Sequence, residues 1–66
     1  MKAQAQIKAW FRTEGRKQTW MAEKVGVDGP VISRWLNGHR VPTKKYRKEL
    51  AKITGLDVSS EYDWTS

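Results

Sequence analysis

The sequence predicts an all-α domain of four to five short helices around a helix-turn-helix, and three observations lead to that prediction. Apolar residues recur at spacings of three and four, which is the period of a helix. No stretch alternates apolar with polar residues for long enough to make a strand. The 66 residues leave room for one small hydrophobic core, so we expect residues 1–66 to form a single domain.

The first helix is expected over about residues 2–14. Ile7, Trp10 and Phe11 lie three and four apart and therefore form one apolar stripe along it. Gly15 follows directly and can adopt the left-handed conformation that ends a helix. The stripe predicts that this helix turns Ile7 and Trp10 into the core.

Two shorter helices are expected next, over residues 18–25 and about residues 30–37. Gly26 ends the first of them, and Pro30 supplies a preset first residue for the second. Asp28 or Gly29 can cap the second helix. Asp28 could instead accept a hydrogen bond from a cytosine amino group, although a carboxylate repels phosphates.

A fourth helix is expected over residues 44–54, with Thr43 as its N-cap and Gly55 closing it. Its buried side should consist of Tyr46, Leu50 and Ile53. A short basic loop, residues 39–42, precedes it, and Pro42 prevents the third helix from continuing. Near the C-terminus, Ser59 or Ser60 could cap one further turn over residues 61–64.

Charge is distributed unevenly along the chain. Thirteen Lys and Arg oppose seven Asp and Glu, which gives a net charge of +6. Residues 1–52 hold all 13 bases and four acids, a balance of +9, whereas residues 53–66 hold three acids and no base, a balance of −3. We expect a basic body with an acidic tail over residues 56–66. The body favours a polyanionic partner, most often nucleic acid, although an anionic membrane surface would attract the same charge.

Composition also excludes several classes of protein. Cysteine is absent and His39 is the one histidine, so neither a disulfide framework nor a zinc site is expected. The sequence offers no paired carboxylates with a shared pocket and no glycine-rich phosphate loop, which argues against an enzyme. No apolar run is long enough to span a membrane, and residues 1–6 lack the apolar core of a signal peptide. We expect a cytoplasmic protein without a cofactor, a metal or a small-molecule ligand.

The segment 18–37 has the spacing of a helix-turn-helix. Ala22 supplies the small residue needed where two helices cross steeply, and Gly26 turns the chain four residues later. The expected apolar contacts of this unit are Met21, Val25, Val27, Ile32 and Trp35. This geometry sets the second helix of the pair, residues 30–37, in a DNA major groove.

Residues 18–27 (QTWMAEKVGV) and 31–38 (VISRWLNG) resemble the small phage and bacterial regulators of the Cro and lambda-repressor type. The resemblance covers roughly residues 7–58. It implies four or five helices and operator binding, usually as a dimer, in a bacterial cell or a phage-infected host. It also implies that Gln18 faces the DNA backbone and sometimes a base, and that Arg34 reaches base edges.

The sequence departs from many of these relatives at two places. Gly29 and Pro30 stand where relatives place polar side chains that read bases, so base reading should shift to Val31, Ser33 or Arg34. Phe11 and Leu36 stand where many relatives pair an Arg with a Glu. An apolar contact in place of an ion pair is often neutral or stabilising. The residues expected to read bases are Arg34, Val31, Ser33 and Gln18.

Basic residues stand at two helix starts, where the helix dipole disfavours them. Arg16 and Lys17 precede the second helix, and Lys44 and Lys45 open the fourth. Because free N–H groups at a helix start bind anions, these lysines and arginines suggest phosphate clamps on either side of the recognition helix. The residues expected to bind phosphates are Arg16, Lys17, Thr19, Asn37, His39, Arg40, Lys44 and Lys45.

The four tryptophans could indicate stacking on single-stranded bases. Trp10 and Trp35 fall on apolar stripes and are expected in the core. Trp20 lies off the expected buried face and could pack under the first helix, touch DNA or meet a partner. Trp64 should cover either the core or a dimer seam.

These features favour a Cro-like repressor that binds a pseudo-palindromic operator in duplex DNA. One small domain presents few base-reading side chains, so two copies are expected, with a dimer that could form only on DNA. The expected seam consists of Leu56, Val58, Tyr62 and Trp64. One alternative is a protein-binding module of the same fold, such as an antitoxin or an inhibitor of a host protein. RNA binding is a third possibility.

Overall fold

The computed structural model describes residues 2–64 and contains helices α1 (Ala3–Glu14), α2 (Gln18–Val25), α3 (Gly29–Leu36) and α4 (Lys44–Thr54). A short 3-10 helix, η1 (Glu61–Trp64), follows them. The described residues contain no strand, so the prediction of an all-α fold is confirmed. Positions 1, 65 and 66, at the ends of the expected domain and acidic tail, lie outside the described part.

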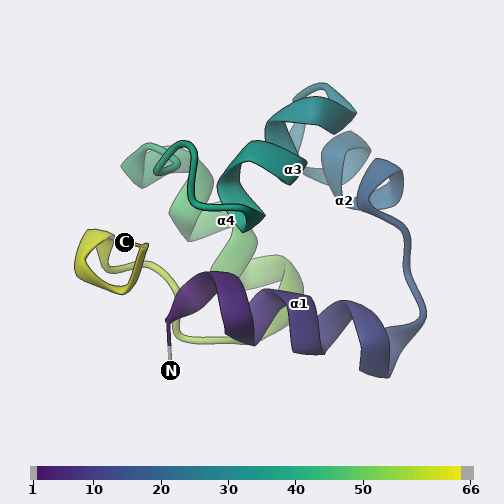
Figure 1. Cartoon of the computed structure of the whole chain (residues 1–66), viewed down its shortest axis with the longest axis horizontal. Coiled ribbons are helices and arrows are strands. Elements are labelled where there is room, and N and C mark those ends of the chain that lie inside the picture. The colour runs from purple at the N-terminus through teal and green to yellow at the C-terminus, as the bar shows by residue number, and fades with distance from the viewer. Residues whose placement is uncertain (1, 65–66) are drawn as a thin grey trace.

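The helices enclose a single core (Figure 1). Helices α2 and α3 lie against each other, and both α1 and α4 pack against this pair. The C-terminal turn η1 lies beside the start of α1, so the two ends of the described chain meet. The element that comes after all four helices therefore packs against α1, and α1 in turn packs against α3.

The turn between α2 and α3 depends on Gly26. Its φ of 88° lies in the left-handed region, and its N–H donates to the carbonyl of Ala22 at 2.8 Å. Val27 donates to the same carbonyl at 3.0 Å. A side chain at position 26 would be strained in this conformation, which explains why the chain turns at a glycine.

The expected boundaries are right for α2, for α4 and for the C-terminal turn η1, and they differ by one residue for α1 and α3. Helix α1 begins at Ala3, after Lys2 in an extended conformation. Helix α3 begins at Gly29 and not at Pro30, because Asp28 is the extended N-cap residue. It ends at Leu36 and not at Asn37, whose ψ of 3° is no longer helical.

Side-chain capping by Asp28 is a further prediction that proves wrong. Asp28 occupies the N-cap position of α3, yet its side chain makes no capping hydrogen bond to any described residue. An N-cap side chain accepts from the second or third helical N–H. The second position is Pro30, which has no N–H, and Val31 donates at 3.0 Å to the main-chain carbonyl of Asp28. Thr43, at the N-cap of α4, also makes no side-chain capping bond within the described chain.

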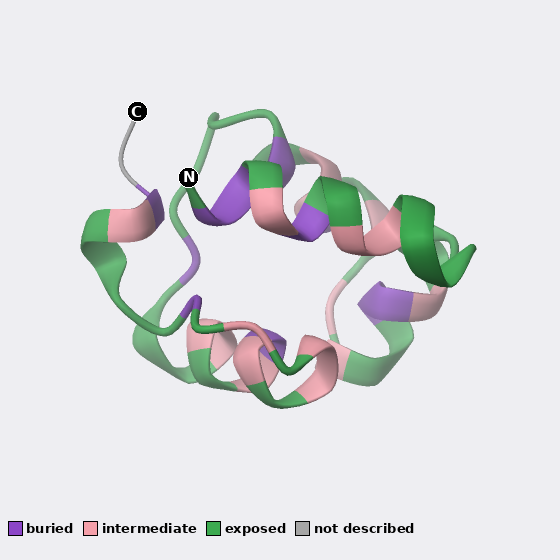
Figure 2. Cartoon of the chain, turned by 90° about the horizontal axis from the view of Figure 1, so that it is seen from below, coloured by how far each residue is buried: buried purple, intermediate pink, exposed green. Residues whose placement is uncertain are grey.

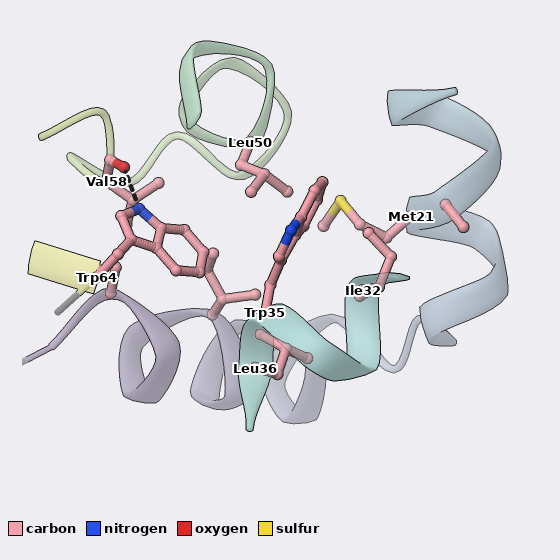
Figure 3. Packing of buried hydrophobic residues seen from close by; sticks show 10 residues of the cluster. Met21, Ile32, Trp35, Leu36, Leu50, Val58 and Trp64 are labelled. Carbon is pink, nitrogen blue, oxygen red and sulfur yellow. Dashed lines mark hydrogen bonds between the residues drawn. The ribbon is translucent and has the colours of Figure 1, made fainter. Parts of the chain in front are cut away.

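The core joins residues from every helix (Figures 2 and 3). Figure 3 shows Met21 and Ile32 at one end of this cluster, Val58 and Trp64 at the other, and Trp35 between them. The buried apolar residues are Ala3, Ile7, Met21, Ala22, Ile32, Trp35, Leu36, Leu50, Val58 and Trp64. Trp10, Phe11, Val25, Val27, Tyr46 and Ile53 are only partly buried at the edges of this cluster.

The expected dimer seam is wrong for two of its four residues. Val58 and Trp64 are 0% and 1% exposed, so neither supplies surface to a partner. The indole N–H of Trp64 donates to the carbonyl of Val58 at 2.7 Å, and Gln4 donates through Nε2 to the carbonyl of Trp64 at 2.7 Å. The tail after Gly55 therefore completes the core of the monomer.

Candidate nucleic-acid interface

Helix α3 has one buried face and one open face. Ile32, Trp35 and Leu36 are buried, whereas Arg34 is exposed and Val31 and Ser33 are partly exposed. The 100° step between successive helical residues places Arg34 opposite the packed side. An arginine on the open face of the second helix of a helix-turn-helix can reach base edges in a major groove.

Arg34 lies beside a hollow of about 280 Å³ between α3 and the start of α4. Arg40 and the exposed side chain of Val41 line the same hollow. The loop is folded back onto the helix, because the N–H groups of His39 and Arg40 donate to the carbonyl of Arg34 at 2.9 and 3.4 Å. The structure thus brings together Arg34 and Arg40, one expected to read bases and the other to bind phosphate.

Ser33 and Asn37 contact each other on α3. The Nδ2 group of Asn37 donates to Oγ of Ser33 at 3.2 Å. A serine hydroxyl that accepts one hydrogen bond retains its own hydrogen as a donor. Ser33 therefore keeps one donor for a base acceptor, while part of the amide of Asn37 is engaged within the protein.

The start of α2 lies next to the start of α3. A Cβ atom placed on Gly29 would lie 3.9 Å from Cγ2 of Thr19, so the first turns of the two helices pack closely. Arg16, Lys17, Gln18 and Thr19 are all exposed there. Lys17 is the N-cap residue, and its side chain makes no capping bond to the described residues. The first N–H groups of α2 and the flanking cations together favour an anion.

The start of α4 has the same arrangement. Lys44 and Lys45 are exposed in its first turn, after the N-cap Thr43. Tyr46 packs behind them against Trp35, with ring centroids 5.4 Å apart, and so connects this turn to the core. The two helix starts with exposed cations therefore belong to α2 and α4, the helices that precede and follow α3 in the chain.

Arg47 is a cation whose role could not be seen in the sequence. Its Nη1 donates to the carbonyl of Pro42 at 2.7 Å, and its Nε donates to the carbonyl of Ser59 at 2.9 Å. These bonds fix the basic loop to the tail. Arg47 is accordingly part of the scaffold of the interface, whereas its neighbours Lys44 and Lys45 present their charge to solvent.

The position of Trp20, which the sequence left open, is resolved in favour of packing beside the first helix. Its ring stacks on that of Trp10 with centroids 6.0 Å apart and planes 25° apart. Trp10 in turn meets Phe11 edge to face at 5.4 Å. Phe11 and Leu36 line one surface hollow, together with Arg16 and Gln18.

The structure also bears on membrane and metal binding. None of the described helices is long and apolar enough to cross a membrane. Among residues 2–64, no three His, Asp or Glu side chains come close enough to hold a metal ion.

A family model described as helix-turn-helix matches residues 7–60 of this chain. The match spans α2, α3 and α4 completely and most of α1. No curated protein and no solved structure matches the chain.

Proposed function

Since the chain belongs to the helix-turn-helix family of Cro and lambda-repressor-type DNA-binding regulators, we propose that it is a sequence-specific repressor acting on a pseudo-palindromic operator. The observation that carries this proposal is the exposed Arg34 on the open face of α3. The family is regulatory and not enzymatic. Its site of action would be the cytoplasm or nucleoid, where the DNA lies.

Base reading is assigned to four side chains. Arg34 is suited to bidentate contact with O6 and N7 of guanine, and the apolar side chain of Val31 to a thymine methyl group. Ser33 offers its remaining hydroxyl donor, and Gln18 projects from the first turn of α2. Because Gly29 and Pro30 bring no polar group to the start of α3, Arg34 should dominate specificity.

Phosphate binding is assigned to the two helix starts and the loop. Each helix start joins helical N–H groups to exposed cations, and both features favour an anion. The loop adds the exposed side chains of His39 and Arg40. The residues proposed to bind phosphates are Arg16, Lys17, Thr19, Asn37, His39, Arg40, Lys44 and Lys45.

Salt dependence tests the cluster at α4. Neutralising a phosphate contributes about −0.9 to the slope of log affinity against log salt, so the double variant Lys44→Ala, Lys45→Ala should reduce the slope by up to about two units. The measurement is a titration of duplex DNA at several salt concentrations. The double variant Lys24→Ala, Lys52→Ala is the matched control, because these lysines lie in the last turns of α2 and α4. Equal slopes in the two double variants would rule out a clamp at α4.

We propose that two copies dimerise on the operator through Leu56 and Tyr62, the two residues of the expected seam that are not buried. Tyr62 is 79% exposed and Leu56 is partly exposed, and both lie on the acidic tail, whose charge keeps it away from DNA. Two-fold symmetry would place half-sites about 10 base pairs apart, centre to centre. Truncation after Gly55 cannot test the seam, because it removes Val58 and Trp64 from the core.

Tyr62→Ala is therefore the test of the dimer. We expect two protein chains per selected operator, and weaker binding of Tyr62→Ala to the full operator with unchanged binding to a single half-site. The measurement is stoichiometric titration at DNA concentrations well above Kd. A stoichiometry of one chain per operator would contradict the dimer, whereas two chains with no effect of Tyr62→Ala would move the seam elsewhere.

A further inference from the structure

Besides packing against the core, the ring of Trp20 lies against two cationic side chains and one aromatic side chain. The guanidinium of Arg16 lies over the ring, 4.6 Å from its centroid, and Nζ of Lys24 lies 5.7 Å from the same centroid. The third neighbour is Trp10, which stacks on Trp20 at 6.0 Å. Trp20 is partly buried and Arg16 is exposed, so the pair connects a fixed aromatic ring to a cation in solvent.

We propose that Trp20 is a positioning residue that holds Arg16 at the start of α2 in the orientation needed to bind a DNA phosphate. This inference rests on the proposed phosphate contact of Arg16. It adds a role for an aromatic residue that does not itself touch DNA.

The chemistry of the guanidinium group makes this arrangement productive. A guanidinium stacks on an indole through its face, while its five N–H donors lie in its plane and point outward. Stacking therefore leaves the donor edge free for bidentate contact with a phosphate. A lysine ammonium has no such separation between a stacking face and a donor edge.

The position of Arg16 explains why such support matters. Arg16 lies between α1 and α2, outside the regular backbone of either helix. A long side chain there loses rotamer freedom when it binds a phosphate, and holding it beforehand lowers that entropic penalty. Trp20 can serve as the fixed ring because Trp10, which stacks on it, belongs to α1 and packs against the core.

Lys24 provides an internal comparison. It contacts the same ring, but it lies in the last turn of α2, where the helix dipole does not favour an anion. Removing Lys24 takes one charge and one cation contact from Trp20 without altering the start of the helix. We expect Lys24→Ala to leave DNA affinity close to that of the unaltered protein.

A double-mutant cycle tests the proposal, with DNA affinity measured on one selected duplex at one salt concentration. Trp20→Leu should weaken binding by about two- to five-fold when Arg16 is present, the range expected for one exposed cation–π contact. In the Arg16→Ala background the same substitution should have no effect. Equal losses in both backgrounds would mean that Trp20 only supports the fold, and would overturn the proposal.

Conservative variants give a second readout that does not depend on a fully stable Trp20→Leu protein. Arg16→Lys should keep the salt slope, because the charge remains, yet lose affinity, because the stacked geometry is lost. Trp20→Phe keeps an aromatic ring but should bind DNA less tightly than the unaltered protein, since phenylalanine is the weaker partner for a cation. Arg16→Lys with full affinity would contradict positioning by the ring.

The same measurements separate this inference from the proposed phosphate contact. If Arg16→Ala changes neither affinity nor salt slope, Arg16 does not bind phosphate. Both the phosphate contact and the positioning role of Trp20 are then refuted. If Arg16→Ala weakens binding but the cycle is additive, the phosphate contact stands and the role of Trp20 alone is refuted.

Discussion

Replacement of Trp64 by alanine is expected to lower the free energy of unfolding by about 3 to 5 kcal/mol, the usual effect of removing a buried tryptophan. Trp64 is 1% exposed, and its indole N–H donates to the carbonyl of Val58 at 2.7 Å. A single core in a chain of this length supplies only about 3 to 5 kcal/mol of net stability. Trp64→Ala should therefore be largely unfolded at 25 °C.

Urea denaturation followed by circular dichroism measures this effect. Tyr62→Ala is the matched control, because Tyr62 belongs to the same 3-10 turn but is 79% exposed, and its loss should change stability by about 0.5 kcal/mol or less. Trp64→Phe should fall between the two, since it keeps an aromatic ring but leaves the carbonyl of Val58 without its donor. A Trp64→Ala protein as stable as Tyr62→Ala would show that the tail is not part of the core.

The tail also shows where the sequence was a poor guide to the fold. The four helices could be predicted because their apolar spacing and terminal glycines are local features. The sequence left open whether Trp64 covers the core or a dimer seam. The choice depends on α1, whose Gln4 donates to the carbonyl of Trp64 across 60 positions of the chain. Gln4 is a polar residue on the face of α1 that also buries Ala3 and Ile7, and the sequence gave no sign that it would bind Trp64.

The candidate interface could also be predicted only in part. The exposed face of α3 follows from the buried positions of Ile32 and Trp35, so the exposure of Arg34 was predictable. The distinction between Arg47, which binds two main-chain carbonyls, and Lys44, which is exposed, was not predictable. Both are cations in the same helix, and only the path of the loop and tail separates their roles.

Substitution of Arg34 by alanine is expected to weaken binding to the preferred operator by about 1 to 3 kcal/mol, or roughly 5- to 150-fold. Binding to random duplex DNA should fall much less. The difference arises because a bidentate contact with guanine is made only on the right sequence, whereas the attraction of a charge to phosphates is made on any sequence.

The experiment begins with selection of bound sequences from random duplex DNA, followed by titration of the selected and a scrambled duplex at one salt concentration. Arg40→Ala is the matched control, since Arg40 is an exposed arginine that lines the same hollow and is assigned to phosphate. Its loss should weaken binding to both duplexes by similar factors. If Arg34→Ala behaves in the same way, Arg34 binds phosphate too, and specificity must then come from Val31, Ser33 and Gln18, of which only the last two can donate hydrogen bonds to a base.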